Sequence, residues 1–355
     1  MKIELFLLGI LPISFKPRLD AQRYGPLGAA LLHLFWHISL RGKKYGVLKA
    51  SASSPAWHKS PYMPSFASPA MPNIFLVQAE SFCDPRLYSV AMPQELLRHY
   101  DNASSNGMST RLKVTAYGAY TMRTEYSVLS GIGADSLGTD AFHPYLSAAR
   151  YPTWSIARFL HSLGYHTVCI HPYYSHFFLR HKAIPNLGFD KFITLENFSW
   201  QDKFGPYVSD KSVAKAMLDL LQEQRPLFCF AITMENHGPW LESRFPADNL
   251  YEQCHESLDL QIRQYLTHLR HADEMIGMLC HGVRQARRNG ILGWYGDHLP
   301  NLPQIIPPDA MATPCLIWNT SESLRYEPAQ SDAIEPEDLC GLLLDCAGLA
   351  NYVHK

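Results

Sequence analysis

Short apolar runs alternate with longer segments of helical periodicity through most of this chain. The runs typical of β-strands lie at residues 73–78, 112–116, 166–170, 227–233, 291–294 and 314–318. Segments with apolar residues at helical spacing lie at residues 154–163, 213–224, 257–288 and 337–349, and another begins after Thr121. This alternation predicts an α/β fold with a largely parallel central sheet flanked by helices.

Acidic, hydroxyl and imidazole side chains fall just past several of these predicted strands. These residues are Glu80, Thr121, His171, His237, Asp297 and His298. Ligands of open α/β sheets bind at the carboxyl ends of the strands, so we expect the six residues to share that edge. Each alone is weak evidence, but independent caps and turn residues would be expected at both edges. The sequence therefore predicts one functional site there.

Three of these positions, and also Arg180, suggest particular chemistry. Asp297 and His298 offer an anionic oxygen and a neutral nitrogen, which together suit Mn²⁺ or Zn²⁺ better than Ca²⁺. Thr121 precedes a helix, where free backbone N–H groups favour an anion, although a threonine there is usually only a cap. Arg180 lies among aromatic residues in a segment too irregular for either periodicity, which predicts a loop. Its planar guanidinium suits a phosphate or sulfate clamp.

The composition limits the partners that the chain can have. Its 355 residues are 47% hydrophobic, which is enough for a substantial core. A formal net charge of -1 gives no broad basic surface, so nucleic acid is not expected as a partner. The eight cysteines include no Cys-x-x-Cys pair, which argues against a zinc ribbon or a thioredoxin-like motif.

The amino-terminal region differs from the rest of the chain. Its two apolar patches, residues 5–15 and 27–40, are each shorter than the roughly 20 residues that a spanning helix needs. Residues 50–72 are rich in Ser, Pro and Ala, which is typical of a linker. We expect residues 1–72 to form a lead-in beside a membrane and residues 73–355 to form the catalytic domain.

Five motifs follow one another in a recognisable order, namely NIFLVQAESF, YGAYTMRTEYSVLSG, HPYYSHFFLRH, TMENHGPW and WYGDH. From about Asn73 to Gly348 the chain resembles the lipoteichoic acid synthase-like phosphoglycerol transferases of the alkaline phosphatase/sulfatase superfamily. The resemblance implies an alkaline phosphatase-like α/β/α sandwich. It also implies a phospholipid-derived phosphoglycerol donor, a glycan acceptor, and a location in the cell envelope, membrane-associated or extracytoplasmic.

The resemblance also implies roles for individual residues. Glu80, Thr121, Asp297 and His298 match the ligands of one divalent ion, which is usually Mn²⁺ in this branch, with Zn²⁺ or Mg²⁺ as alternatives. Thr121 also matches the nucleophile, which would form a covalent phospho-threonine. The residues that match the binding positions for phosphate and glycerol are Arg180, His237 and His171. Phe178 stands where an indole is common, which leaves head-group recognition open because Phe lacks an N–H donor.

Other functions remain open at this point. Attack of water on the intermediate would give a phosphodiesterase, and a catalytically inactive binding or scaffold protein would keep the fold alone. A sulfatase needs a C/S-x-P-x-R motif, of which Cys83-Asp-Pro-Arg86 is a near miss. A two-zinc phosphatase needs further ligands. His255, His268 and His271 are available, but their place on or near an amphipathic helix predicts that they face solvent.

Overall fold

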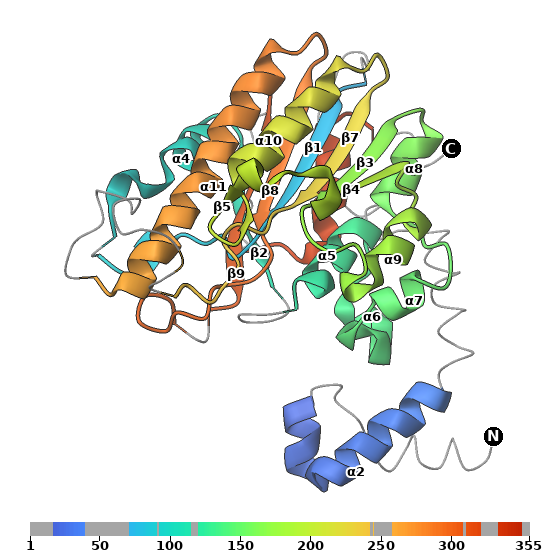
Figure 1. Ribbon diagram of the computed structural model, residues 1–355. Coiled ribbons are helices and arrows are strands. Elements are labelled where there is room, and N and C mark those ends of the chain that lie inside the picture. The colour runs from blue at the N-terminus through green and yellow to red at the C-terminus, as the bar shows by residue number, and fades with distance from the viewer. Residues whose placement is uncertain are drawn as a thin grey trace.

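The computed structural model describes residues 17–39, 71–90, 92–114, 120–241, 244, 258–307, 310–320 and 333–349 (Figure 1). A seven-stranded sheet lies at its centre, in the order β2-β9-β8-β1-β7-β3-β4. Its strands are β1 (Asn73–Ala79), β2 (Met108–Lys113), β3 (His166–His171), β4 (Lys191–Thr194), β7 (Leu227–Ile232), β8 (Gly290–Gly296) and β9 (Ala312–Asn319). Only β9 runs against its neighbours β8 and β2, so the predicted, largely parallel sheet is confirmed.

The central strands are covered on both faces. Every residue of β1, β7 and β8 is buried, as their unbroken apolar sequences predict for parallel strands between two layers of helices. Along β1, Phe75 and Val77 pack into the core on one face, whereas Ile74 and Leu76 pack into the core on the other. Because successive side chains point to opposite faces of the sheet, each strand contributes residues to both cores.

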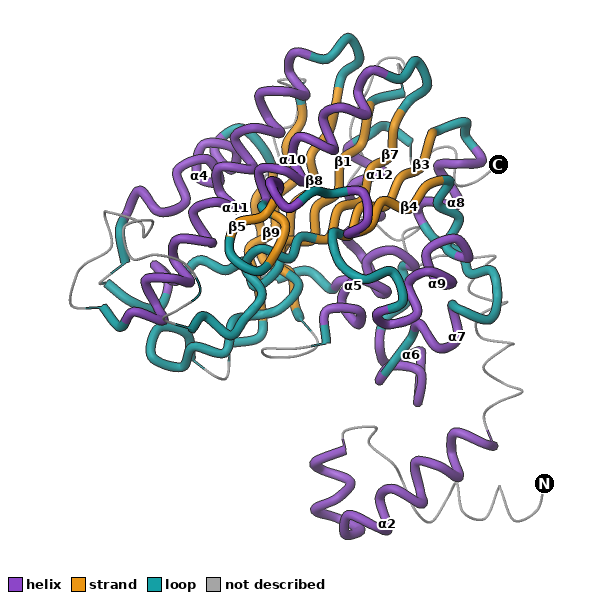
Figure 2. Tube along the Cα trace, viewed as in Figure 1, coloured by secondary structure: helices purple, strands orange, loops and turns teal. Residues whose placement is uncertain are grey.

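Helices form the two outer layers (Figures 1 and 2). One face carries α4 (Arg98–Ser105), α10 (Asp210–Asp219) and α11 (Leu260–Gln285), and the other carries α5 (Thr121–Ser130), α8 (Ile156–Ser162), α9 (Arg180–Asn186) and α12 (Leu339–Cys346). Smaller elements are α6 (Ala134–Leu137), α7 (Tyr145–Ala148), and a hairpin of β5 (Lys203–Phe204) and β6 (Tyr207–Val208). The α/β/α sandwich that the resemblance implies is confirmed.

Three local predictions need correction. The segment that leads to Arg180 is a loop ending in a 3₁₀ turn (Phe177–Leu179), but Arg180 itself is the first residue of helix α9. The strand expected at residues 112–116 lies earlier, as β2. Helix α4 was not predicted, since its sequence is polar and its first turn depends on Asp273 of α11, whose carboxylate accepts the N–H groups of His99 and Tyr100 (2.9 and 2.7 Å). Each of these elements is fixed by contacts with distant residues.

The amino-terminal region is described only in part. Helix α2 (Pro17–Ser39) contains most of the second apolar patch and bends at Gly25. Within the described ranges, no helix combines the length and the apolar character needed to cross a membrane. The first apolar patch and the predicted linker up to residue 70 lie outside the described residues. The domain boundary near residue 72 therefore stays a prediction.

Candidate active site

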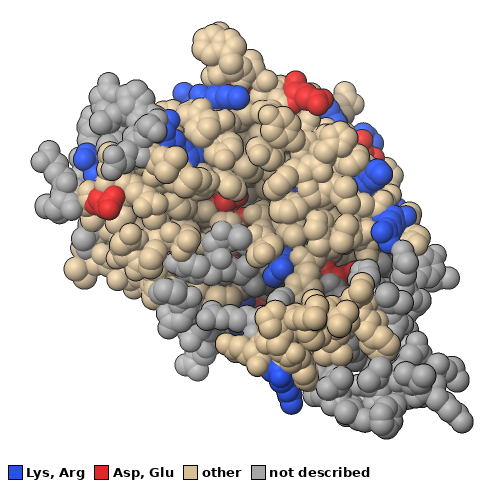
Figure 3. Space-filling view, turned by 60° about the horizontal axis from the view of Figure 1, so that its bottom comes forward, with Lys and Arg blue, Asp and Glu red and all other residues tan. Residues whose placement is uncertain are grey.

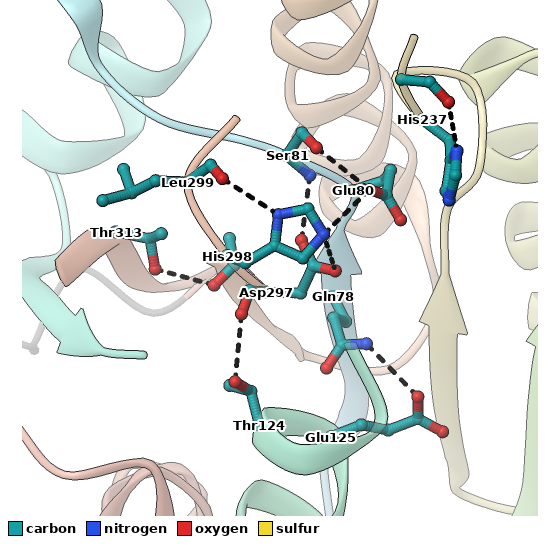
Figure 4. A network of polar contacts seen from close by, with 12 residues as sticks. Gln78, Glu80, Ser81, Thr124, Glu125, His237, Asp297, His298, Leu299 and Thr313 are labelled. Carbon is teal, nitrogen blue, oxygen red and sulfur yellow. Dashed lines mark hydrogen bonds and ion pairs between the residues drawn. The ribbon is translucent and has the colours of Figure 1, made fainter. Parts of the chain in front are cut away.

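Two loops at the carboxyl edge of the sheet bring three of the predicted metal ligands together (Figure 4). Glu80 follows β1, and Asp297 and His298 follow the adjacent β8. His298 Nε2 lies 3.3 Å from Glu80 Oε1 and 3.4 Å from Asp297 Oδ2. One ligand atom from each residue lies within 4.8 Å of the other two, and all three side chains are buried. The parallel pairing of β1 with β8 makes these two loops neighbours.

Hydrogen bonds from Ser81 hold the carboxylates of Glu80 and Asp297 in place. The N–H of Ser81 donates to Asp297 Oδ1 (2.9 Å), and the Ser81 hydroxyl donates to Glu80 Oε1 (3.0 Å). Ser81 has a φ of 52°, so the chain turns in a left-handed conformation directly after Glu80. A Cβ at Gly296 would lie 2.1 Å from the carbonyl oxygen of Phe82, so the glycine of the YGDH motif is required for this close approach. Ser81 was missed from the sequence because its contribution is partly a backbone one.

Thr121, the predicted nucleophile, faces the same site. It is the first residue of α5, one position inside the helix, and the N-cap is Tyr120 with a φ of 67°. The Thr121 side chain lies close enough to the Asp297 carboxyl group to counteract part of the rise in the pKa of that group. Thr124 Oγ1 donates to the backbone carbonyl of Asp297 (3.0 Å), which anchors the first turn of α5 on this loop. The structure thus brings Thr121 next to the carboxylate and imidazole cluster.

Burial and mutual charge set the protonation of the cluster. Burial, together with the charge of Glu80, raises the pKa of Asp297 to about 6. Burial opposes protonation of His298, but the carboxylates of Asp297 and Glu80 outweigh it and raise the pKa of His298 to about 9. Burial would likewise raise the pKa of Glu80, yet His298 lowers it. The charges of these three buried groups therefore compensate one another.

The cluster fits a divalent cation. Asp297 Oδ2 is buried and, within the described part of the chain, takes part in no hydrogen bond. Two carboxylates, an imidazole nitrogen and a hydroxyl form a donor set that matches Mn²⁺ or Zn²⁺. Glu80, Thr121, Asp297 and His298 would hold this ion.

Arg180 lies at the same edge and is held by a buried carboxylate. Its Nε and Nη2 donate to Glu125 Oε1 and Oε2 at 3.2 and 2.5 Å, and both side chains are fully buried. The hydroxyl of Tyr145 and the amide of Gln78 also contact Glu125. Glu125 lies four residues after Thr121, so one face of α5 supplies both. The sequence motif contained Glu125, but its spacing alone could not identify Arg180 as its partner.

His171 supports Arg180 from the end of β3. Burial and the charge of Arg180 hold the pKa of His171 well below 6.5, so its ring is neutral. The ring then donates from Nδ1 to the carbonyl of Ile232 (3.4 Å) and accepts at Nε2 from Arg180 Nη1 (3.2 Å). Both ring nitrogens therefore have protein partners. A direct contact of His171 with substrate stays a prediction.

His237 approaches the site from the loop after β7. Its Nδ1 lies 2.6 Å from the carbonyl oxygen of Gly238, so this nitrogen carries the hydrogen that the carbonyl accepts. The hydroxyl of Tyr207 lies 3.5 Å from the same nitrogen. The Nε2 atom is then the one that can exchange a proton with a bound molecule.

A cavity of about 530 Å³ joins these groups. Its lining includes Thr121, Glu80, His298, Arg180, His171, His237 and Phe178, together with the aromatic residues Tyr120, Tyr173, Phe177, Tyr207 and Trp240. The Phe178 ring lies 5.3 Å from the guanidinium carbon of Arg180, so it covers one face of that cation. The face of the molecule in Figure 3 is hollowed, and acidic side chains are visible inside the hollow.

The structure bears on two predictions about alternative chemistry, one for Cys83 and one for the histidines of α11. Cys83 is fully buried and lies 2.9 Å from the Tyr265 hydroxyl, and burial raises the pKa of its thiol, so it is not placed as a sulfatase nucleophile. The prediction that His268 and His271 face solvent is wrong. His268 is fully buried and His271 is mostly so, because both turn inward to the carboxylate of Glu235. His255 lies outside the described residues.

Comparison with known proteins places the chain in a family. A family model described as Sulfatase matches residues 72–349. The chain belongs to the sulfatase family. This sulfatase-family chain is 29% identical over 348 residues to a Rhizobium meliloti (strain 1021) protein named capsular polysaccharide biosynthesis protein RkpI. The match covers 94% of this chain but only 60% of the relative, so the chain spans less than two thirds of that protein.

Two solved structures are similar in fold. One is Streptococcus pyogenes phosphoglycerol transferase GacH in complex with sn-glycerol-1-phosphate, with a TM-score of 0.66, 20% identity, and coverage of 90% of this chain and 85% of that one. The other is lipoteichoic acid synthase LtaP from Listeria monocytogenes, with a TM-score of 0.65, 19% identity, and coverage of 86% and 78%. These similarities confirm the alkaline phosphatase-like fold.

Proposed function

We propose that this chain is a metal-dependent phosphoglycerol transferase that modifies a cell-envelope glycan through a covalent phospho-threonine intermediate. The observation that carries the proposal is the position of Thr121, whose side chain meets the Asp297 carboxyl group in a cavity that Arg180 and His237 also line. A divalent cation held by Glu80, Asp297 and His298 would lower the pKa of the Thr121 hydroxyl and offset negative charge on the phosphoryl group.

Arg180 would bind the phosphoryl oxygens. Three of its five N–H groups are directed to Glu125 and His171. The other two are available for oxygens that gain charge as the transition state forms. Because Glu125 and His171 fix the guanidinium before substrate arrives, little reorganisation is required during the reaction. This pre-orientation favours phosphoryl transfer over simple anion binding.

The proposed reaction has two half-reactions. In the first, Thr121 Oγ bonds to phosphorus, its proton passes to solvent, and the bond from phosphorus to the diacylglycerol oxygen breaks. His237 Nε2 gives that oxygen a proton. In the second, a glycan hydroxyl attacks phosphorus and gives its proton to His237, and Thr121 leaves and regains a proton from solvent. Water in place of the glycan hydroxyl would make the enzyme a phosphodiesterase.

Donor, acceptor and location belong to the same proposal. The solved neighbours named a phosphoglycerol transferase and a lipoteichoic acid synthase support a phosphatidylglycerol donor, and the relative named for capsular polysaccharide biosynthesis supports a glycan acceptor. Because such a donor resides in the bilayer, we place the enzyme in the cell envelope, next to a membrane. The aromatic lining of the cavity suits a polyol or sugar, whose C–H groups pack on aromatic faces.

The direct test is a search for the intermediate. Purified protein is incubated with Mn²⁺ and labelled phosphatidylglycerol, and peptides are analysed by mass spectrometry. We expect a phosphoglycerol adduct on Thr121 that disappears when an envelope glycan is added and the label moves to the glycan. Protein that binds metal yet carries no adduct on any residue would contradict the proposal. Label released as glycerol phosphate, with or without glycan, would assign a hydrolase.

A further inference from the structure

A second cluster of imidazole and carboxylate groups lies close to the active site. Glu235 precedes His237 by two residues in the loop after β7. Its Oε1 lies 2.9 Å from His268 Nδ1 and 2.6 Å from His271 Nδ1. The two histidines are three residues apart on α11, so they share one face of that helix. One ligand atom from each of the three residues lies within 4.8 Å of the others.

A second buried carboxyl group, that of Asp210, lies beside this cluster. Glu235 is fully buried, and the imidazole groups of His268 and His271 both hydrogen-bond its carboxylate. The carboxyl group of Asp210 is also fully buried beside Glu235, and within the described residues neither of its oxygens takes part in a hydrogen bond. Arg244 contacts the backbone oxygen of Glu235 but neither carboxylate. A buried carboxyl group without a hydrogen-bond partner is costly, and a cation bound beside it would reduce that cost.

We propose that Glu235, His268 and His271 form a second divalent-cation site, of the class that binds Zn²⁺. Two imidazole nitrogens and one carboxylate oxygen are a zinc donor set. The other carboxylate oxygen, Oε2, accepts the backbone N–H of Asp210 (2.7 Å), an outer contact of the kind that orients metal ligands. The side chain of His271 is 28% exposed, so an ion can reach the site from solvent.

The ion would have a structural effect on the active site. Glu235 and His237 belong to one turn, and His268 and His271 belong to α11, which packs against β8 and α10. A shared ion would tie that turn to the helix and so fix the position of His237. This role is independent of the proposed transferase activity, because the ion would bind whether or not the protein transfers a phosphoryl group.

The test is a count of bound Zn²⁺ in the full chain. Metal is removed with a chelator, the protein is dialysed against buffered Zn²⁺, and bound zinc is measured by mass spectrometry. We expect two equivalents for the unaltered protein and one for each of Glu80→Gln, Glu235→Gln and His271→Gln. His281→Gln, on the exposed side of the same helix, is the matched control and should keep two. Circular dichroism shows whether each variant is folded.

X-ray absorption at the zinc edge separates the two sites. The first site has one histidine, His298, whereas the proposed site has two. The single ion that remains in Glu80→Gln should therefore show two imidazole ligands, and the ion that remains in His271→Gln should show one. One equivalent with a single imidazole ligand in the unaltered protein, or two equivalents retained in folded His271→Gln, would overturn the proposal and leave hydrogen bonds alone to join Glu235 to the histidines.

Discussion

The molecule contains two buried carboxylate and imidazole clusters that differ in what surrounds them. The first cluster is formed by Glu80, Asp297 and His298, and the second by Glu235, His268 and His271. The first lies at the ends of two parallel strands and opens into a cavity beside a threonine hydroxyl and a fixed guanidinium. The second lies between a turn and the face of a long helix. A carboxylate and imidazole cluster alone therefore does not mark a reaction centre, and the groups on which we base that proposal are the threonine hydroxyl and the guanidinium beside the first cluster.

One segment connects the two clusters. Thr233 Oγ1 accepts the N–H of Glu80 (3.0 Å), Glu235 belongs to the second cluster, and His237 lines the cavity. Alternate residues of this segment thus serve the first cluster, the second cluster and the substrate cavity. We expect substitutions in the first cluster to slow the reaction strongly, and substitutions in the second to have smaller effects that act through the position of His237.

The largest effect is expected at Thr121, which lies beside the first cluster only. Thr121→Ala should lower the transferase rate by a factor on the order of 10⁴ or more, because the covalent route loses its nucleophile. Thr121→Ser keeps a hydroxyl and should retain measurable activity. Rates are measured with labelled phosphatidylglycerol, with zinc content as a control for site integrity. Full activity of Thr121→Ala with normal metal content would show that Thr121 is not the nucleophile. The first cluster would then no longer differ from the second in having a nucleophile beside it.

A matched pair of carboxylate substitutions compares the clusters directly. Glu80→Gln should lower the rate by a factor on the order of 10³, since electrostatic stabilisation worth several kcal/mol is lost. Glu235→Gln should lower it only about 10-fold, in the range for outer contacts that orient functional groups. Both are measured at saturating Mn²⁺ or Zn²⁺. Equal losses in the two variants would indicate that both clusters take part in chemistry.

The first cluster could be predicted from the sequence, and the second could not. Glu80, Asp297 and His298 each follow an apolar strand, and parallel strands deliver their ends to one edge, so sequence position already implies proximity. His268 and His271 lie on an amphipathic helix, where spacing shows that they share a face but not which face is covered. Only the fold shows that both histidines face the interior, where they contact Glu235 from a distant turn.

Elements of the fold that depend on contacts with distant residues were likewise missed from the sequence. The apolar runs of β1, β7 and β8 were predicted as strands, and these strands lie side by side within the sheet. The four-residue strand β4 and the polar helix α4 were missed because each depends on distant partners, as the capping of α4 by Asp273 illustrates. Helix α9 was not predicted either, and it starts at Arg180, whose buried ion pair with Glu125 spans 55 residues of sequence.

Substitution of Glu125, whose carboxylate orients Arg180, is expected to have a smaller effect than Glu80→Gln. Glu125→Gln replaces one acceptor oxygen with an amide group and so removes one of two hydrogen bonds to a charged group. Such a bond is worth about 1.5–3 kcal/mol, so kcat/KM should fall roughly 10- to 100-fold. If Glu125 acts only through Arg180, the double variant with Arg180→Ala should be no worse than Arg180→Ala alone. Additive losses in this cycle would mean that Glu125 has a role of its own.

The smallest effect concerns His171, which is neutral because Arg180 and burial hold its pKa well below 6.5. The unfolded chain takes up a proton on this histidine near pH 6.5 and the native protein does not, so native stability is lost as pH falls below that value. Each pH unit below 6.5 should cost at most about 1.4 kcal/mol. Urea unfolding at pH 7.5 and 5.5 should therefore show a smaller loss for His171→Gln than for the unaltered protein, whereas between pH 7.5 and 8.5 the two should change in parallel. An identical loss on acidification in both proteins would show that His171 is charged in the native state, and a charged ring could not accept the hydrogen bond of Arg180.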